Sequence, residues 1–170
     1  CREQGAQDGA TQFNRCEGIT YDRQNGHIYF IASTAGPLGA GQIFRYTPAD
    51  DSLVLVTQVD DRSVLSMPDN VTVAPWGDLV MAEDNYDRKG ATSQYVRGMR
   101  SDGSVYNILR NARNTMPNEP AGPAAEQVPP GAEFAGYCFS PDGSTLFVNM
   151  QSPENVTIAI RGDWGALASA

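Results

Sequence analysis

The chain has 170 residues, of which 41% are hydrophobic and 19% are charged, and this composition suits one soluble globular domain or part of a larger one. The net charge of −8 argues against a nucleic-acid partner, because nucleic-acid-binding surfaces are basic. No apolar run approaches the roughly 20 residues of a membrane-spanning helix. Clustered carboxylates point instead to hard cations such as Ca²⁺.

The chain begins at Cys1 rather than at a methionine, which fits a fragment, a trimmed chain or a mature chain cut from a precursor; a lipidated cysteine is less favoured. The other two cysteines are Cys16 and Cys138, and the spacing of the three matches no zinc motif. Cys16 and Cys138 lie in β-like runs, so we expect them to be small buried side chains.

Residues 1–12 are polar and predict a lead-in loop. A first set of four antiparallel strands follows, joined by turns that include the strong hairpin signal Asn25-Gly26. The expected strands cover residues 18–22, 27–34, 42–47 and 53–59.

A second set of four strands is expected after residue 67, and a third set of three strands after residue 132. The second set covers residues 70–74, 79–82, 95–100 and 104–109, and the third covers 134–140, 146–150 and 156–161. Between them, the proline-rich stretch 111–132 predicts a long loop or insertion. Residues 165–170 form a small-residue tail.

The first strands of the three sets carry an acidic residue near their start: Glu17, Asp69 and Glu133. A four-strand unit that repeats in this way is typical of a β-propeller blade, although an antiparallel sandwich also has many short strands. We therefore predict an all-β partial propeller over residues 13–164. Its blades would span about residues 13–60, 67–110 and 132–164.

In a propeller the first strand of each blade lines the central channel, so the three acids would converge at one mouth of it. Glu83, at the end of a second strand, would return to the same mouth. Crowded carboxylates are costly unless a cation or protons offset their charge, and oxygen ligands suit Ca²⁺. The alternative is that these acids lie on solvated loops.

Arg15 and Glu17 are two residues apart at a strand start, so their side chains should project from the same face. Such a pair can serve an oxyanion and a metal ion together, or it can be an ordinary surface ion pair. His27, the only histidine, follows a turn at the other end of the strands, and we interpret it as a turn or surface residue.

A propeller takes about four to eight blades, so three blades must be completed by other parts of the same precursor or by another chain. An open arc of three blades would expose apolar sheet faces.

Several motifs occur in order along the chain: Phe-Asn-Arg-Cys-Glu-Gly-Ile at 13–19, Gly-Gln-Ile-Phe-Arg-Tyr at 41–46, Met-Pro-Asp-Asn-Val-Thr-Val-Ala-Pro-Trp-Gly at 67–77, Ala-Glu-Asp at 82–84, and the run that begins Glu-Phe-Ala-Gly-Tyr-Cys-Phe at 133–139. Together they closely resemble the C-terminal part of the PhoX-type alkaline phosphatases. The resemblance covers nearly all of residues 11–164.

The resemblance implies a six-bladed propeller, exported to the periplasm or outside the cell, that hydrolyses phosphate monoesters with calcium and iron (Fe³⁺). Carried over by motif, Arg15 would hold the phosphate and Glu17 would bridge metals. Asp69 and Glu133 would be calcium ligands. Asn70 and Glu83 would be weaker metal-ligand candidates, and Cys16 is not the family's iron ligand.

Two functions are therefore expected from the sequence. The first is the C-terminal portion of a metal-dependent phosphatase, of which this chain would hold about half the site. The alternative is a non-catalytic, calcium-stabilised propeller module that binds a partner or has a structural role.

Overall fold

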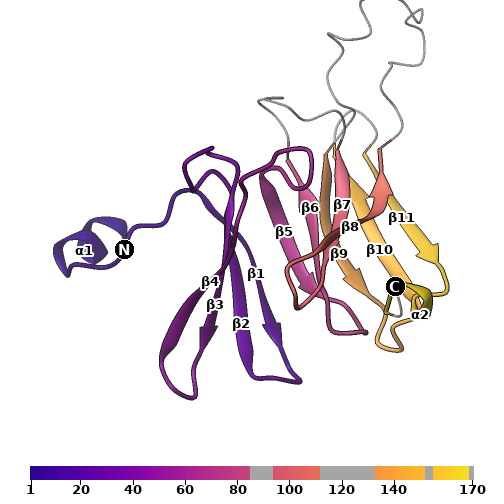
Figure 1. Cartoon of the computed structure of the whole chain (residues 1–170), viewed down its shortest axis with the longest axis horizontal. Coiled ribbons are helices and arrows are strands. Elements are labelled where there is room, and N and C mark those ends of the chain that lie inside the picture. The colour runs from indigo at the N-terminus through magenta and orange to yellow at the C-terminus, as the bar shows by residue number, and fades with distance from the viewer. Residues whose placement is uncertain (85–93, 112–132, 152–154, 169–170) are drawn as a thin grey trace, which may run out of the picture.

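The computed structural model of the chain describes residues 1–84, 94–111, 133–151 and 155–168. The described part is mostly β, and it forms three antiparallel sheets that stand side by side (Figure 1). In every sheet the strands follow one another in chain order. This is the blade arrangement predicted from the repeated strand pattern.

The first sheet is β1 (Cys16–Asp22), β2 (His27–Ala32), β3 (Gln42–Thr47) and β4 (Ser52–Gln58). The second is β5 (Pro68–Val73), β6 (Leu79–Glu83), β7 (Tyr95–Met99) and β8 (Val105–Arg110). The third has three strands, β9 (Phe134–Phe139), β10 (Thr145–Met150) and β11 (Val156–Arg161).

The first strands of the three sheets lie next to one another, because β5 contacts both β1 and β9. Gly18 allows β1 to reach β5: a Cβ added there would lie only 2.5 Å from the carbonyl oxygen of Asp69. On the other side, the Tyr137 hydroxyl of β9 lies 2.6 Å from the carbonyl oxygens of Asn70 and Val80. The first strands therefore form the inner edge of the arc.

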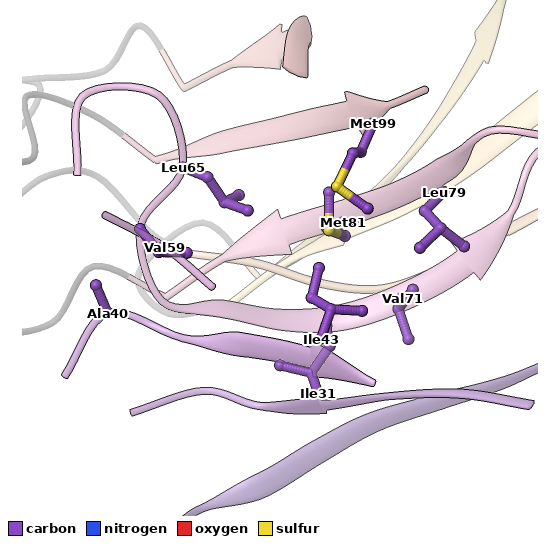
Figure 2. Close-up of a cluster of buried hydrophobic side chains, with 9 residues drawn as sticks. All are labelled: Ile31, Ala40, Ile43, Val59, Leu65, Val71, Leu79, Met81 and Met99. Atoms are coloured by element: carbon purple, nitrogen blue, oxygen red, sulfur yellow. The ribbon is translucent and has the colours of Figure 1, made fainter. Parts of the chain in front are cut away.

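Two separate cores hold the sheets together, one on each side of the second sheet. Figure 2 shows the first core, in which Ile31 and Ile43 of the first sheet face Val71 and Met81 of the second. The second core lies between the second and third sheets and is built from Ala74, Val80, Ala82, Val96, Phe134, Leu146 and Val148.

All five residues of β6 are buried, because this strand belongs to both cores. Leu79 and Met81 pack in the first core, and Val80 and Ala82 pack in the second. Successive side chains of a strand point to opposite faces, so a strand between two sheets is apolar on both faces and loses the usual alternation.

The first sheet leaves much of its outer face exposed, with only the Phe13 ring packed on Phe30 and Phe44 among the ring contacts described. Ile19, Tyr21, Leu53 and Leu55 are between 46% and 69% exposed, and their cross-strand pairing puts them on one face with Phe30 and Phe44. An apolar face of this kind is typical of a surface that packs against another part of a protein.

Three features of the chain differ from the sequence-based expectations. The lead-in segment contains a short helix, α1 (Arg2–Gln7), and the C-terminal tail contains another, α2 (Gly165–Ala168). Cys16 and Cys138 are exposed rather than buried, because their side chains point away from the two cores. Residues 112–132 of the predicted insertion lie outside the described residues.

We expect the replacement of Gly18 by alanine to lower the free energy of unfolding by about 1–3 kcal/mol, the usual cost of overpacking. The added Cβ would meet backbone atoms of Asp69 and Val71 at 2.5 and 2.8 Å, and these cannot rotate away. Urea unfolding of the complete protein measures the loss.

Gly162→Ala is the matched control, since its Cβ would meet only the Trp164 ring, at 3.6 Å. This control should change the free energy of unfolding by no more than about 0.5 kcal/mol. Equal losses in the two variants would contradict the close packing of β1 on β5.

Candidate metal centre

Three carboxylates meet at the inner edge of the second and third sheets. Asp69, Asp84 and Glu133 each offer an oxygen atom, and these atoms all lie within 4.8 Å of one another. All three residues are half-buried. They come from the start of β5, the residue after β6 and the residue before β9, so the cluster exists only when the two sheets are packed together.

Backbone hydrogen bonds fix the ends of these strands in the same way in every sheet. The residue before each first strand accepts a bond from the residue after each second strand. The three bonds are Ser33 N to Arg15 O at 2.9 Å, Asp84 N to Met67 O at 3.0 Å and Gln151 N to Glu133 O at 3.1 Å.

Each first strand also carries one extra residue opposite its second strand, close to its start. The irregularity falls between Cys16 and Ile19 in β1 and between Pro68 and Asn70 in β5. In β9 it falls where Ala135 and Tyr137 pair with consecutive residues of β10. Such bulges bend the strand and re-aim side chains, and here all three lie at the acidic end.

This register shows that the three acids near the strand starts do not all occupy equivalent positions. Glu17 and Asp69 occupy the same position, the second residue of their strands. Glu133 instead occupies the position of Arg15 and Met67, two residues earlier. Glu133 nevertheless lies at the same end of the sheets, because its carboxylate is within 4.8 Å of those of Asp69 and Asp84.

The crowding of the carboxylates changes their affinity for protons. Burial raises the pKa of Glu133 to about 8, and a hydrogen bond with Asp84 and the charges of the neighbouring acids add to this effect. Burial also raises the pKa of Asp69 to about 6, and the charges of Glu17 and Asp84 act in the same direction. The site therefore favours positive charge.

Arg15 and Glu17 form the ion pair expected from their spacing, with Arg15 Nη2 3.4 Å from Glu17 Oε1. Both side chains are partly exposed, at 46% and 35%. Their charges reach the cluster, because Glu17 raises the pKa of Asp69 and Arg15 lowers it. Arg15 also adopts a left-handed backbone conformation, with φ of +52°, which is a strained state for a residue other than glycine.

Asn70 joins the second sheet to the third. Its side-chain oxygen accepts a hydrogen bond from the backbone N–H of Gly136 at 3.3 Å, and its carbonyl oxygen accepts one from the Tyr137 hydroxyl at 2.6 Å. Asn70 follows Asp69 directly, so these bonds hold the start of β5 beside the strand that follows Glu133.

Glu83 lies outside the cluster and has other partners. Its side chain is fully buried, and Oε1 accepts hydrogen bonds from Arg97 Nε at 3.0 Å and from Ser66 N at 2.9 Å. The reason is the alternation along β6, which puts Glu83 on the face of Leu79 and Met81, toward the first sheet.

Asp84 takes the place in the cluster that the sequence analysis gave to Glu83. It continues the face of Val80 and Ala82, which meets the third sheet and therefore Glu133. The alternation can be read from the sequence, but the choice between the two faces cannot, because it depends on which sheet covers which face.

The donor set fits a hard divalent cation. Three carboxylates within a few ångströms provide the oxygen ligands that Ca²⁺ prefers. Glu17 lies near enough to raise the pKa of Asp69, but it is paired with Arg15, so the cluster keeps an excess of negative charge that is costly without a cation. Asp69, Asp84 and Glu133 would hold this cation. No thiolate or imidazole belongs to the cluster among the described residues.

Comparison with known proteins relates the chain to one protein family and to solved structures of the same fold. The family model of the alkaline phosphatase PhoX matches residues 1–154. No curated protein matches the chain. Among solved structures, PhoX of Pseudomonas fluorescens in complex with vanadate, a transition state analogue, superimposes with a TM-score of 0.65 and 21% identity over 94% of this chain and 36% of that chain.

The periplasmic gluconolactonase PpgL of Pseudomonas aeruginosa superimposes with a TM-score of 0.58 and 17% identity over 89% of this chain and 40% of that chain. These likenesses show the shared fold, and this chain spans well under half the length of either protein. The family match covers most of the chain and agrees with the motifs identified in the sequence. The chain therefore belongs to the PhoX alkaline phosphatase family.

Proposed function

We propose that this chain forms part of a metal-dependent phosphatase that hydrolyses phosphate monoesters. The observation that carries the proposal is the convergence of Asp69, Asp84 and Glu133 at the inner edge of the sheets. The Arg15–Glu17 pair beside them supports it, because it adds a guanidinium to a carboxylate site. Membership of the PhoX family gives the reaction class.

The remaining part of the site would come from further blades that close the propeller to six. The chain spans 36% of the PhoX structure that it superimposes on, and the outer face of its first sheet exposes large apolar side chains. These blades would belong to the same precursor or to another chain. They would supply the other metal ligands and the second half of the substrate pocket.

Within this chain, Arg15 would orient the substrate. A guanidinium offers N–H groups in a fixed fork that matches two oxygens of a phosphate. Glu17, 3.4 Å away, holds the guanidinium in place and would bridge cations. Asp69, Asp84 and Glu133 would ligate Ca²⁺, and the Asn70 amide oxygen is a weaker candidate.

When bound, the cations would neutralise charge on the phosphoryl group and provide an activated water as nucleophile. The protein's own contribution is to orient the ester and to hold the carboxylates together, where a bound cation would displace their protons. Fe³⁺ is proposed on the family resemblance alone. A periplasmic or extracellular location is proposed on the same basis. Within the described ranges, no helix is long and apolar enough to cross a membrane.

We expect Glu17→Gln to lower kcat/KM for a chromogenic phosphate monoester by at least about 10²-fold, a typical loss for a group that positions charge in an active site. The substitution keeps the shape of the side chain but removes the charge that would bridge the cations. Steady-state kinetics of the complete protein, supplied with Ca²⁺ and Fe³⁺, measures the effect.

Glu3→Gln provides the matched control, because Glu3 is exposed in α1. Its kcat/KM should equal that of the unchanged protein. If Glu17→Gln turned over the ester at the unchanged rate, the phosphatase assignment of this site would be wrong. Calcium binding without any hydrolysis would favour the non-catalytic propeller module instead.

Calcium removal should make the stability of the protein strongly dependent on pH. The pKa of Glu133 is about 8 in the folded protein against 4.5 for the free group, and that of Asp69 is about 6 against 3.8. From about pH 4 to about pH 8 the folded state binds more protons than the unfolded state, so the free energy of unfolding falls as pH rises. This loss of stability is nearly complete once the pH exceeds the folded-state pKa of Glu133, which is about 8.

Thermal unfolding with a chelator at pH 5 and pH 8.5 measures this loss, and saturating Ca²⁺ should remove most of it because the cation replaces the protons. Glu133→Gln should also flatten the dependence. A chelated protein that melts at the same temperature at both pH values, or that is more stable at pH 8.5, would contradict the crowded carboxylate site.

A further inference from the structure

A buried ion pair lies directly beside the acidic cluster without being part of it. Glu83 is fully buried and Arg97 is 7% exposed, and Glu83 Oε1 lies 3.0 Å from Arg97 Nε. Burying two charges is expensive, and an apolar pair of the same volume is often at least as stable. A contribution to stability therefore does not explain why this buried ion pair is present.

The ion pair links three strands of the second sheet to the segment between β4 and β5, which connects the first sheet to the second. Arg97 of β7 donates through Nη1 to Asn107 Oδ1 of β8 and through Nη2 to the Ser63 carbonyl oxygen at 3.4 Å. Glu83 of β6 accepts from the N–H of Ser66 at 2.9 Å. Ser63 and Ser66 both belong to the segment that leads into β5.

These contacts act on both cluster acids of the second sheet. Ser66 lies three residues before Asp69, and Glu83 directly precedes Asp84. Between them, Asp84 N donates to Met67 O at 3.0 Å, and Met67 has a left-handed backbone with φ of +48°. The Glu83 carboxylate thus fixes the two backbone segments that carry Asp69 and Asp84 relative to each other.

The other two sheets have no charge at the corresponding position. The pairings Cys16–Ala32, Pro68–Glu83 and Phe134–Met150 are equivalent in register, so Ala32 and Met150 stand where the second sheet has Glu83. Blade architecture alone is therefore satisfied by an apolar residue. The ion pair occurs in the sheet that supplies two of the three cluster carboxylates.

From these observations we propose that Glu83 and Arg97 are positioning residues. They hold Asp69 and Asp84 at the separation that a cation requires, and Glu83 itself does not ligate the metal. This inference rests on the proposed function for the identity of the site as a metal centre, and it replaces the sequence-based expectation that Glu83 is a ligand.

The test compares two changes at Glu83 by the equilibrium binding of Ca²⁺ to the complete protein, measured by titration calorimetry. In Glu83→Gln the side-chain oxygen can still accept from both Arg97 and Ser66, since both donors reach the same atom. Because Arg97 loses its counter-charge in this variant, calcium affinity is measured at a temperature where the chelated variant is fully folded. Calcium affinity should stay within about threefold. If Glu83 were a calcium ligand, its replacement by glutamine would lower the calcium affinity by far more than threefold.

The double variant Glu83→Leu/Arg97→Met removes both charges together, so that neither is left buried without its partner. We expect the calcium dissociation constant to rise about 10–100-fold, as for other residues that orient metal ligands. The melting temperature of the chelated protein should stay close to that of the chelated unchanged protein, because both charges are removed together. Met150→Leu, at the equivalent position of the third sheet, is the control for packing and should bind calcium normally.

Each result has a separate meaning. Unchanged calcium affinity in the double variant, or a loss of tenfold or more in Glu83→Gln, would overturn the positioning role while leaving the metal centre intact. Absence of calcium binding in the unchanged protein would overturn the metal centre, and the positioning role with it.

Discussion

The close approach of the first strands is the constraint on which this structure depends. At Gly18 there is no room for a side chain between β1 and β5, and on the other side Tyr137 and Asn70 connect β9 to β5 through hydrogen bonds. Because the strands meet at this inner edge, whatever lies at their starts is forced together. The half-buried Asp69 and Glu133 therefore lie beside other carboxylates, and the raised pKa values of these two residues follow from that packing.

The second sheet is covered on both faces, and this determines the environments of the acids at the end of β6. Its β6 strand contributes Met81 to one core and Ala82 to the other, and this division continues into its two terminal acids. Glu83 turns toward the first sheet and becomes half of a buried ion pair. Asp84 turns toward the third sheet and joins Glu133. Two adjacent carboxylates thereby acquire different chemical environments.

The acidic end is also the place where the backbone is least regular. Bulges occur near the start of all three first strands, and the residues before β1 and β5, Arg15 and Met67, have left-handed conformations. Both features cost stability that the packed cores offset. Their recurrence at one edge fits a site whose side chains must be aimed inward, as in other proteins where bulges lie next to functional residues.

The sequence by itself determined the strands, the turns and the family. Alternating apolar residues and turn signals such as Asn25-Gly26 act locally, so the three sheets followed from short stretches of chain. The spacing of Arg15 and Glu17 also predicted their pairing, which the structure shows although Arg15 lies just before β1 in a left-handed conformation. Asp69 and Glu133 were recognised as acids at strand starts and do meet in the structure.

Only the tertiary structure decided that Asp84 rather than Glu83 completes the cluster, that Glu133 stands in register with Arg15, and that Cys16 and Cys138 are exposed. The physical reason is common to all three. A strand sequence defines two faces and an order, but which face meets a neighbour, and at which residue the ladders align, depends on contacts between segments far apart in the chain.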